Sequence, residues 1–313
     1  MNTKTILRLF TVAFALSLGV PTALRVQAAA RGEPPPARVP DGTKAIRDLA
    51  YTSNGHAKQK LDLYLPEQST GPLPLIIWVH GGGWQNGTKD QCLPLRLGFT
   101  GRGYAVASLN YRLSGDAIFP AQIEDCQAAV RWLRDHAKEF NLDPERLAAW
   151  GSSAGGHLVA LLGTAGDSNG FTPTPAPKTS SRVQAVCDFY GPVDLSVFVV
   201  TPGYTGHAKP DSPESKLLGA AVLDVPAKAK RANPITYITP HCPPFHIIHG
   251  SADPVVPPNQ GALLNAALTA AGIESSYRTI EGAKHGGPEF SAPAVANEKC
   301  RRSDRHSESL HAL

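Results

Sequence analysis

The segment from Trp150 to His157 reads Trp-Gly-Ser-Ser-Ala-Gly-Gly-His and lies between two apolar runs, one typical of a strand and one typical of a helix. It therefore predicts a sharp strand-to-helix turn. Glycine two positions before and two positions after a serine lets such a turn form without clashes. Ser153 has glycine at both positions, whereas Ser152 has Trp150 on one side. Ser153 is the candidate nucleophile; the alternative is a glycine-rich turn that only connects two elements.

Apolar runs alternate with helical patterns along most of the chain. Nearly continuous runs at 73–79 and 105–109 predict strands covered on both faces, whereas strict alternation at 60–65 predicts a half-exposed strand. Pro120 is placed to start a helix with an apolar stripe. Further strands are expected at 183–190, 245–248 and 277–280, and a further helix at 260–271. This alternation predicts an α/β fold with a mostly parallel sheet and helices on both faces.

Residues 1–28 are expected to be a secretory signal peptide. Lys4 and Arg8 precede an apolar run at 9–24, and Val26-Gln27-Ala28 supplies small residues for cleavage. The run is shorter than the roughly 20 residues that span a bilayer, so we expect no membrane anchor after cleavage. These features predict a secreted or periplasmic protein.

Composition argues against a nucleic-acid partner. The whole chain of 313 residues has a formal charge of +4, but residues 1–28 hold three basic residues and no acidic one, so their removal leaves +1. Five cysteines would permit two disulfides with one cysteine left over, and none has metal-ligand spacing. They are Cys92, Cys126, Cys187, Cys242 and Cys300.

Four further divisions of the chain are predicted. Residues 29–44 form a proline-rich linker, 45–290 the α/β domain, and 291–313 an atypical polar tail. Within the domain, 193–240 fits the alternation poorly and is rich in proline, glycine and lysine. This segment is either an irregular surface excursion or a small cap over a substrate cleft, and its length favours the cap.

A glycine loop, His80-Gly81-Gly82-Gly83-Trp84, follows the strand predicted at 73–79. Consecutive glycines let backbone N–H groups point at one spot, as is needed to stabilise the negative oxygen that forms when a carbonyl is attacked. A flexible turn or a nucleotide phosphate loop are the alternatives. The phosphate loop is disfavoured because neither Gly-x-Gly-x-x-Gly nor Gly-Lys-Ser/Thr is present.

Two aspartates compete for the role of holding a catalytic histidine. Asp253 lies in His249-Gly250-Ser251-Ala252-Asp253 after the strand at 245–248, and Asp194 follows the strand at 183–190. An aspartate in such a turn is more often a capping residue. Asp253 is favoured because it precedes the candidate histidine in the expected chain order.

His285, flanked by Gly282, Gly286 and Gly287 in the loop after the last predicted strand, is the candidate base. His157 is on the helix behind the turn and faces the wrong way. His241, His246 and His249 resemble a metal cluster, but His246 and His249 fall on opposite faces of one strand. No metal site is therefore predicted.

The order Ser153, Asp253, His285, with the glycine loop upstream, is that of α/β-hydrolases. The quoted motifs resemble the hormone-sensitive-lipase-like branch of that superfamily. Two further runs, Phe-Pro-Ala-Gln-Ile-Glu-Asp-Cys at 119–126 and Ser-Pro-Glu-Ser-Lys-Leu-Leu-Gly at 212–219, resemble bacterial exported esterases related to bifunctional feruloyl and acetyl-xylan esterases. The similarity covers residues 45–290.

This resemblance implies an eight-stranded, mainly parallel sheet with a small cap insertion, and hydrolysis of carboxylic esters without a cofactor. Carried over by position, Ser153 is the nucleophile, His285 the base and Asp253 the residue that orients it. The oxyanion N–H groups would come from Gly82, Gly83 and Ala154. The family usually continues into a final amphipathic helix, whereas 297–306 holds almost no apolar residues here, so we expect that helix to be lost or altered, as by a frameshift.

The sequence thus predicts an exported serine esterase that acts through an acyl-enzyme on short-chain esters, with acetyl or feruloyl esters of plant polysaccharides as candidate substrates. A peptidase of the same fold and a catalytically inactive binding protein are the alternatives. The oligomeric state and the natural substrate are not determined by any motif.

Overall fold

The computed structural model describes residues 38–167, 170–171 and 177–291. The predicted signal peptide, most of the predicted linker and residues 292–313 of the tail lie outside the described residues. In the described part of the chain, no helix combines the length and apolar character needed to cross a membrane.

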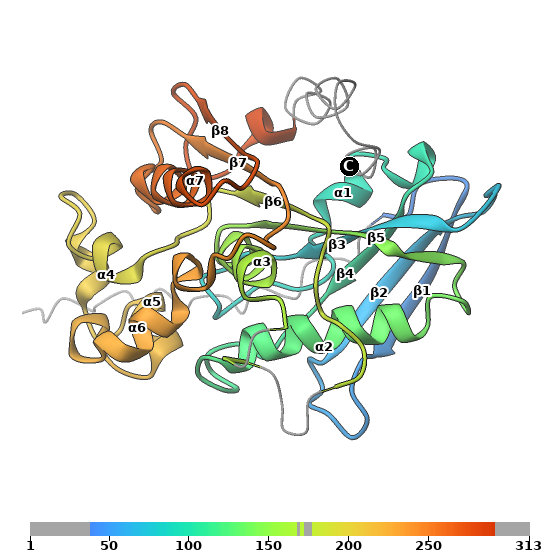
Figure 1. Ribbon diagram of the computed structural model, residues 1–313, viewed down its shortest axis with the longest axis horizontal. Helices are drawn as coiled ribbons and strands as arrows, with labels where there is room; N and C mark the ends of the chain where they lie inside the picture. The colour runs from blue at the N-terminus through green and yellow to red at the C-terminus, as the bar shows by residue number, and fades with distance from the viewer. Residues whose placement is uncertain (1–37, 168–169, 172–176, 292–313) are drawn as a thin grey trace, which may run out of the picture. The chain divides into compact units, whose positions relative to one another are not determined.

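One eight-stranded sheet organises the described residues, with β1 and β2 at one edge and β8 at the other (Figure 1). The strand order is β1-β2-β4-β3-β5-β6-β7-β8. The pairs β1–β2 and β2–β4 are antiparallel, and the other neighbouring pairs are parallel. The strands are β1 (Thr43–Ala50), β2 (Lys60–Pro66), β3 (Leu73–Val79), β4 (Ala105–Leu109), β5 (Leu142–Ser152), β6 (Ala185–Phe189), β7 (Phe245–Gly250) and β8 (Ser275–Ile280). The predicted eight-stranded, mainly parallel sheet is confirmed.

Helices cover both faces of this sheet. Alternate residues point to opposite faces, so Ile77 belongs to a core shared with α2 (Ala121–Asp135), α3 (Ala154–Ala165) and α7 (Asn259–Ala270). Its neighbour Ile76 belongs to a second core shared with α1 (Leu93–Arg96). The apolar stripe predicted for α2 is fully buried; its members are Ile123, Cys126, Val130 and Leu133.

The prediction that residues 60–65 form a half-exposed strand is wrong. β2 lies between β1 and β4, and even Asp62 is 0% exposed. Asp62 is tolerated there because its carboxylate lies 2.8 Å from the Lys89 ammonium and 3.0 Å from the Arg47 guanidinium. The polar residue in the alternating pattern therefore marks a buried ion cluster and not a solvated face.

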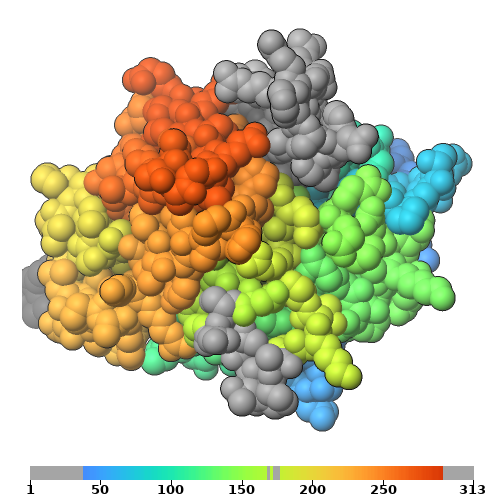
Figure 2. Space-filling model, viewed as in Figure 1, coloured from blue at the N-terminus to red at the C-terminus, as the bar shows by residue number. Residues whose placement is uncertain are grey.

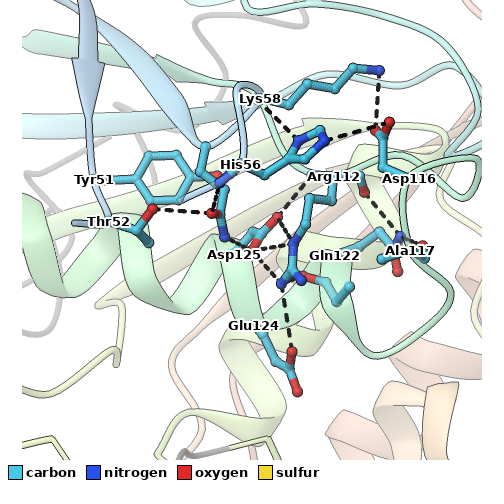
Figure 3. Close-up of polar contacts among 12 residues, drawn as sticks. Tyr51, Thr52, His56, Lys58, Arg112, Asp116, Ala117, Gln122, Glu124 and Asp125 are labelled. Carbon is cyan, nitrogen blue, oxygen red and sulfur yellow. Dashed lines mark hydrogen bonds and ion pairs between the residues drawn. The ribbon is translucent and has the colours of Figure 1, made fainter. Parts of the chain in front are cut away.

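The start of α2 is tied to the β1–β2 connection by a polar cluster (Figure 3). Asp125, with a side chain 1% exposed, accepts hydrogen bonds from the Arg112 guanidinium, the Arg112 backbone N–H and the Gln59 amide. This cluster connects three segments that are distant in sequence. None of the four described cysteines, Cys92, Cys126, Cys187 and Cys242, is in a disulfide.

The segment predicted as a cap, 193–240, folds into short helices between β6 and β7: α4 (Leu195–Phe198), η2 (Thr205–Ala208), α5 (Pro213–Leu218), η3 (Val222–Asp224), α6 (Pro226–Ala232) and η4 (Pro234–Tyr237). In the space-filling view its yellow-to-orange residues lie together on one side of the face shown (Figure 2). Its helices contact α3 and α7 through η4, so the segment is packed against the α/β core.

Candidate active site

Ser153 lies in the turn between β5 and α3 with φ +55° and ψ −124°, a conformation that L-residues rarely adopt. The turn is held because Ser153 N–H donates to the Phe189 carbonyl at 2.8 Å. The flanking glycines are needed for space: a Cβ on Gly151 would lie 2.3 Å from the Gly155 carbonyl oxygen. A Cβ on Gly155 would lie 2.1 Å from the Val79 oxygen of β3. The glycine spacing thus reflects close backbone packing around a strained serine.

The three side chains predicted to converge form one hydrogen-bonded chain. Ser153 Oγ lies 2.8 Å from His285 Nε2, and His285 Nδ1 lies 2.7 Å from Asp253 Oδ2. They come from the ends of β5, β7 and β8, which parallel strands bring to one edge of the sheet. Because Asp253 is an acceptor, Nδ1–H donates to it, and Nε2 is left to accept the Ser153 proton.

Asp253 is held by more than His285. Its side chain is 0% exposed, and its Oδ1 accepts N–H bonds from Val255 at 2.8 Å and Val256 at 3.0 Å. His249 Nε2 lies 3.2 Å from Asp253 Oδ2. Burial alone would raise the pKa of Asp253, but the hydrogen bonds from His249, His285 and Val256 hold it well below its ordinary value. The carboxylate is therefore ionised and fixed in orientation.

Asp194, the alternative candidate for orienting His285, has a structural role instead. Asp194 Oδ1 accepts the N–H groups of Ser196 and Val197 at the start of α4, and its Oδ2 accepts from the Asn233 side chain at 2.9 Å. It is an N-cap that also joins two parts of the 193–240 segment. The alternative that Asp194 orients His285 is not supported by this geometry.

The imidazole rings of the other histidines considered from sequence contact groups other than Ser153. His157 is buried, with Nε2 2.7 Å from the Ala232 carbonyl oxygen. His246 Nδ1 contacts the Ser276 hydroxyl at 2.6 Å on β8, whereas His249 faces Asp253. His241 is exposed. Within the described ranges, no group of three or more His, Cys, Asp or Glu residues is arranged to hold a metal ion.

The glycine loop at 81–83 lies directly against the nucleophile turn. A Cβ on Gly81 would lie 2.8 Å from the Ser152 carbonyl oxygen and 3.1 Å from Ser153 Cβ. Gly82 and Gly83 have φ of +109° and +59°, and the Gly82 carbonyl accepts the N–H groups of residues 85 and 86, which closes the loop. Ala154 begins α3 immediately after Ser153. All the residues predicted to form the oxyanion hole therefore border the same space.

That space is a cavity of about 490 Å³, within the range of small-molecule sites. His80, the buried residue before the glycine loop, is fixed by Tyr111: the two rings stack with centroids 4.5 Å apart, and the Tyr111 hydroxyl donates to the His80 carbonyl at 3.0 Å. The lining comes from the glycine loop, the nucleophile turn, the 193–240 segment and both loops that carry Asp253 and His285. Its residues are Gly81, Gly82, Gly83, Trp84, Gln85, Asn86, Gln91, Ser152, Ser153, Ala154, Tyr190, Pro192, His207, Pro213, Glu214, Val255, Val256 and His285.

Sequence reasoning missed Tyr190 and the contact of His249 with Asp253. The Tyr190 ring meets the His285 ring edge-on, with centroids 4.7 Å apart, and Tyr190 has φ +44°. Burial raises the pKa of Tyr190 above its ordinary value, so its hydroxyl stays protonated. The position of Tyr190 directly after a core strand could have indicated a role in the site, because sites in such sheets form at the edge where parallel strands end.

Comparisons with known proteins agree with this geometry. A protein-family model described as BD-FAE matches residues 61–268. Esterase LipQ of Mycobacterium tuberculosis is 32% identical over 246 residues, which cover 76% of this chain and 56% of LipQ. Esterase LipC of the same organism is 31% identical and covers 81% of this chain and 64% of LipC. The chain thus spans between half and two thirds of the length of these relatives.

Two solved structures are also similar. A truncated form of a carbohydrate esterase from gut microbiota has a TM-score of 0.73 and 31% identity, over 82% of this chain and 93% of that one. An acetyl ester-xyloside bifunctional hydrolase from Caldicellulosiruptor lactoaceticus has a TM-score of 0.65 and 26% identity, with the same two coverages.

Proposed function

Since the chain belongs to the BD-FAE family, we propose that it is a serine esterase that hydrolyses carboxylic esters through an acyl-enzyme. Ser153 Oγ attacks the ester carbonyl while His285 Nε2 takes its proton. The tetrahedral intermediate collapses, His285 returns the proton to the leaving alcohol, and the acyl group stays on Ser153. A water molecule, deprotonated by His285, then attacks the acyl-enzyme and releases the acid.

The observation that carries this proposal is the hydrogen-bonded chain from Ser153 Oγ through His285 to Asp253 Oδ2, with distances of 2.8 and 2.7 Å, opening into the cavity. One ring nitrogen of His285 is hydrogen-bonded to the nucleophile, and the other is hydrogen-bonded to a buried carboxylate. This arrangement stabilises the imidazolium that forms during attack.

The backbone N–H groups of Gly82, Gly83 and Ala154 are proposed to form the oxyanion hole. Gly82 and Gly83 adopt positive φ, and Ala154 N–H is at the first residue of a helix, where it has no partner within the helix. Donors of this kind are each worth about 3 to 4 kcal/mol of transition-state stabilisation. Their proximity to Ser153 supports the assignment.

The proposed substrates are short-chain esters of carbohydrates, with acetyl and feruloyl esters of plant polysaccharides as the candidates. Two structural neighbours, a carbohydrate esterase and an acetyl ester-xyloside bifunctional hydrolase, support this proposal. Residues 193–240 are proposed to act as the cap, since His207, Pro213 and Glu214 line the cavity. Export to the periplasm or beyond is proposed from the signal-peptide pattern of residues 1–28.

The test is a pair of neighbouring substitutions, Ser153→Ala and Ser152→Ala, assayed with p-nitrophenyl acetate and with a fluorophosphonate probe. Ser153→Ala should lose about 10⁴-fold or more in kcat and should not be labelled. Ser152→Ala should still be labelled, because it keeps the nucleophile. Undiminished hydrolysis by Ser153→Ala, or a probe adduct elsewhere, would defeat the proposal.

A further inference from the structure

A second acid–imidazole pair borders the cavity, and the proposed catalytic steps do not use it. His207 in η2 and Glu214 in α5 both belong to the 193–240 segment, and His207 Nδ1 lies 2.9 Å from Glu214 Oε2. Both residues line the same cavity as Ser153. Glu214 is the third residue of the Ser-Pro-Glu-Ser run that the family resemblance singled out.

Glu214 is buried in the first turn of α5. The residue is 3% exposed, and His207 is its one side-chain hydrogen-bond partner among the residues that the structure describes. It is not required as a helix cap, because Ser212 Oγ already accepts Ser215 N–H at the start of α5. Burying a carboxyl group is costly unless it is paired. The pair with His207 is therefore the interaction that keeps Glu214 in place.

His207 is held so that one ring nitrogen remains available. Nδ1–H donates to Glu214, and the Phe198 ring packs on the imidazole with centroids 4.7 Å apart. The side chain is 24% exposed, and no described residue forms a hydrogen bond with its Nε2. The hydrogen bond to Glu214 raises the pKa of His207, so Nε2 carries a proton over a wider pH range.

His207 is also distinctive in the charge that it can carry. The described residues that line the cavity include no lysine or arginine, so His207 and His285 are the side chains there that can become cationic. His285 Nε2 is already directed at Ser153. A donor fixed by a buried acid, separate from the nucleophile, matches a group that recognises substrate and does not react with it.

We propose that His207, oriented by Glu214, is a specificity-determining residue whose Nε2 hydrogen-bonds a hydroxyl group on the alcohol half of the ester. The site then favours acetates of sugars and other polyols over acetates of alcohols without further hydroxyls. This inference rests on the proposed function, because the alcohol must leave from an acyl group on Ser153. His207 acts through binding, and Glu214 is a positioning residue.

The experiment compares kcat/KM for mono-acetylated methyl xyloside with kcat/KM for cyclohexyl acetate, which has a ring of similar size without hydroxyls. For His207→Leu, the ratio of the two values should fall about 10- to 100-fold, the worth of one charge-assisted hydrogen bond. The loss should appear mainly as a higher KM for the xyloside acetate. His207→Gln, which keeps a donor, should fall between the wild type and His207→Leu. His241→Leu, an exposed histidine outside the cavity, should leave the ratio unchanged.

Glu214→Gln separates positioning from packing, since the amide oxygen still accepts Nδ1–H but no longer balances the imidazolium. For Glu214→Gln, the ratio of kcat/KM for the xyloside acetate to kcat/KM for cyclohexyl acetate should also fall, as for His207→Leu. An unchanged ratio in His207→Leu and His207→Gln, including equal losses on both esters, would overturn the inference. A wild type that shows no preference for the xyloside acetate would overturn it as well. Failure of Ser153 labelling is a separate result, which would remove the proposed function itself.

Discussion

Asp253 and Asp194 each follow a core strand, yet their carboxylates meet different partners. Asp253 contacts two imidazoles and two backbone N–H groups, whereas Asp194 caps α4 and contacts Asn233. At the scale of single residues, the role of an aspartate is therefore decided by the direction of its side chain, and sequence position alone does not determine that direction.

Substituting these two aspartates gives a matched comparison. Asp253→Asn keeps the shape but favours the wrong tautomer of His285, and we expect kcat for p-nitrophenyl acetate to fall by about 10⁴-fold. Asp194→Asn should retain turnover and lower the free energy of unfolding by about 1 to 2 kcal/mol, since asparagine also caps helices but loses the hydrogen bond from Asn233. Comparable losses of kcat in both variants would contradict the assignment of Asp253.

The convergence of Ser153, Asp253 and His285 could be predicted because each follows a strand, and parallel strands bring their carboxyl ends to one edge. Two other side-chain contacts could not be predicted in the same way. The approach of His249 to Asp253 depends on how the chain turns after β7, and the pairing of His207 with Glu214 depends on the packing of two short helices. Neither contact follows from a local sequence period.

At the scale of elements, α2 is anchored at its beginning by Asp125, which contacts Arg112 (Figure 3). The Gln59 side chain also donates to Asp125. Asp125→Asn removes the negative charge and directs an amide nitrogen at donors. Because Arg112 would lose its nearly buried counter-charge, we expect the free energy of unfolding to fall by about 3 to 5 kcal/mol. Urea unfolding followed by circular dichroism measures this difference.

Glu124→Gln is the control for this prediction. Glu124 is 43% exposed and lies 3.7 Å from the same guanidinium, so its loss should cost less than about 1 kcal/mol. If both variants had the same unfolding midpoint, Asp125 would not anchor α2 as inferred.

The elements that sequence patterns predicted well are those with a strong period and a buried face, such as α2, β3 and β4. β2 was misread because Asp62 interrupts its apolar residues, although the structure neutralises Asp62 with Lys89 and Arg47. The helices of 193–240 were not predicted individually. The three α-helices among them, α4, α5 and α6, have four to seven residues, begin at prolines or caps, and are stabilised mainly by tertiary packing.

At the scale of the whole molecule, buried histidines predict sensitivity to acid. Burial lowers the pKa of His80 and His157 from 6.5 to about 4. The unfolded chain binds protons at these sites first, so the stability that they contribute is present above pH 6.5 and is lost as the pH falls toward 4. Each histidine accounts for about 3 kcal/mol of that loss.

Asp188 acts in the opposite direction over an overlapping range. It is 0% exposed behind the nucleophile turn, and burial raises its pKa from 3.8 to about 6. Its contribution to stability is present below pH 3.8 and is lost as the pH rises through 6, which amounts to about 3 kcal/mol. Acidification from pH 6.5 to 4 therefore removes the contribution of two histidines and restores that of one aspartate, so these three groups together should lose about 3 kcal/mol.

Asp188→Asn separates these opposing contributions. The Asn side-chain oxygen can still accept Gly191 N–H, which lies 3.0 Å from Asp188 Oδ1, and the substitution removes the buried ionisation. Between pH 6.5 and pH 4 we expect the variant to lose about 3 kcal/mol more than the wild type, because the aspartate no longer offsets one histidine. Free energies of unfolding from urea titrations of both proteins at about pH 6.5, 5 and 4 measure how steeply the stability of each protein falls with pH. Parallel slopes for the wild type and Asp188→Asn would mean that Asp188 is ionised in the folded protein throughout this range, and the predicted offset would then be absent.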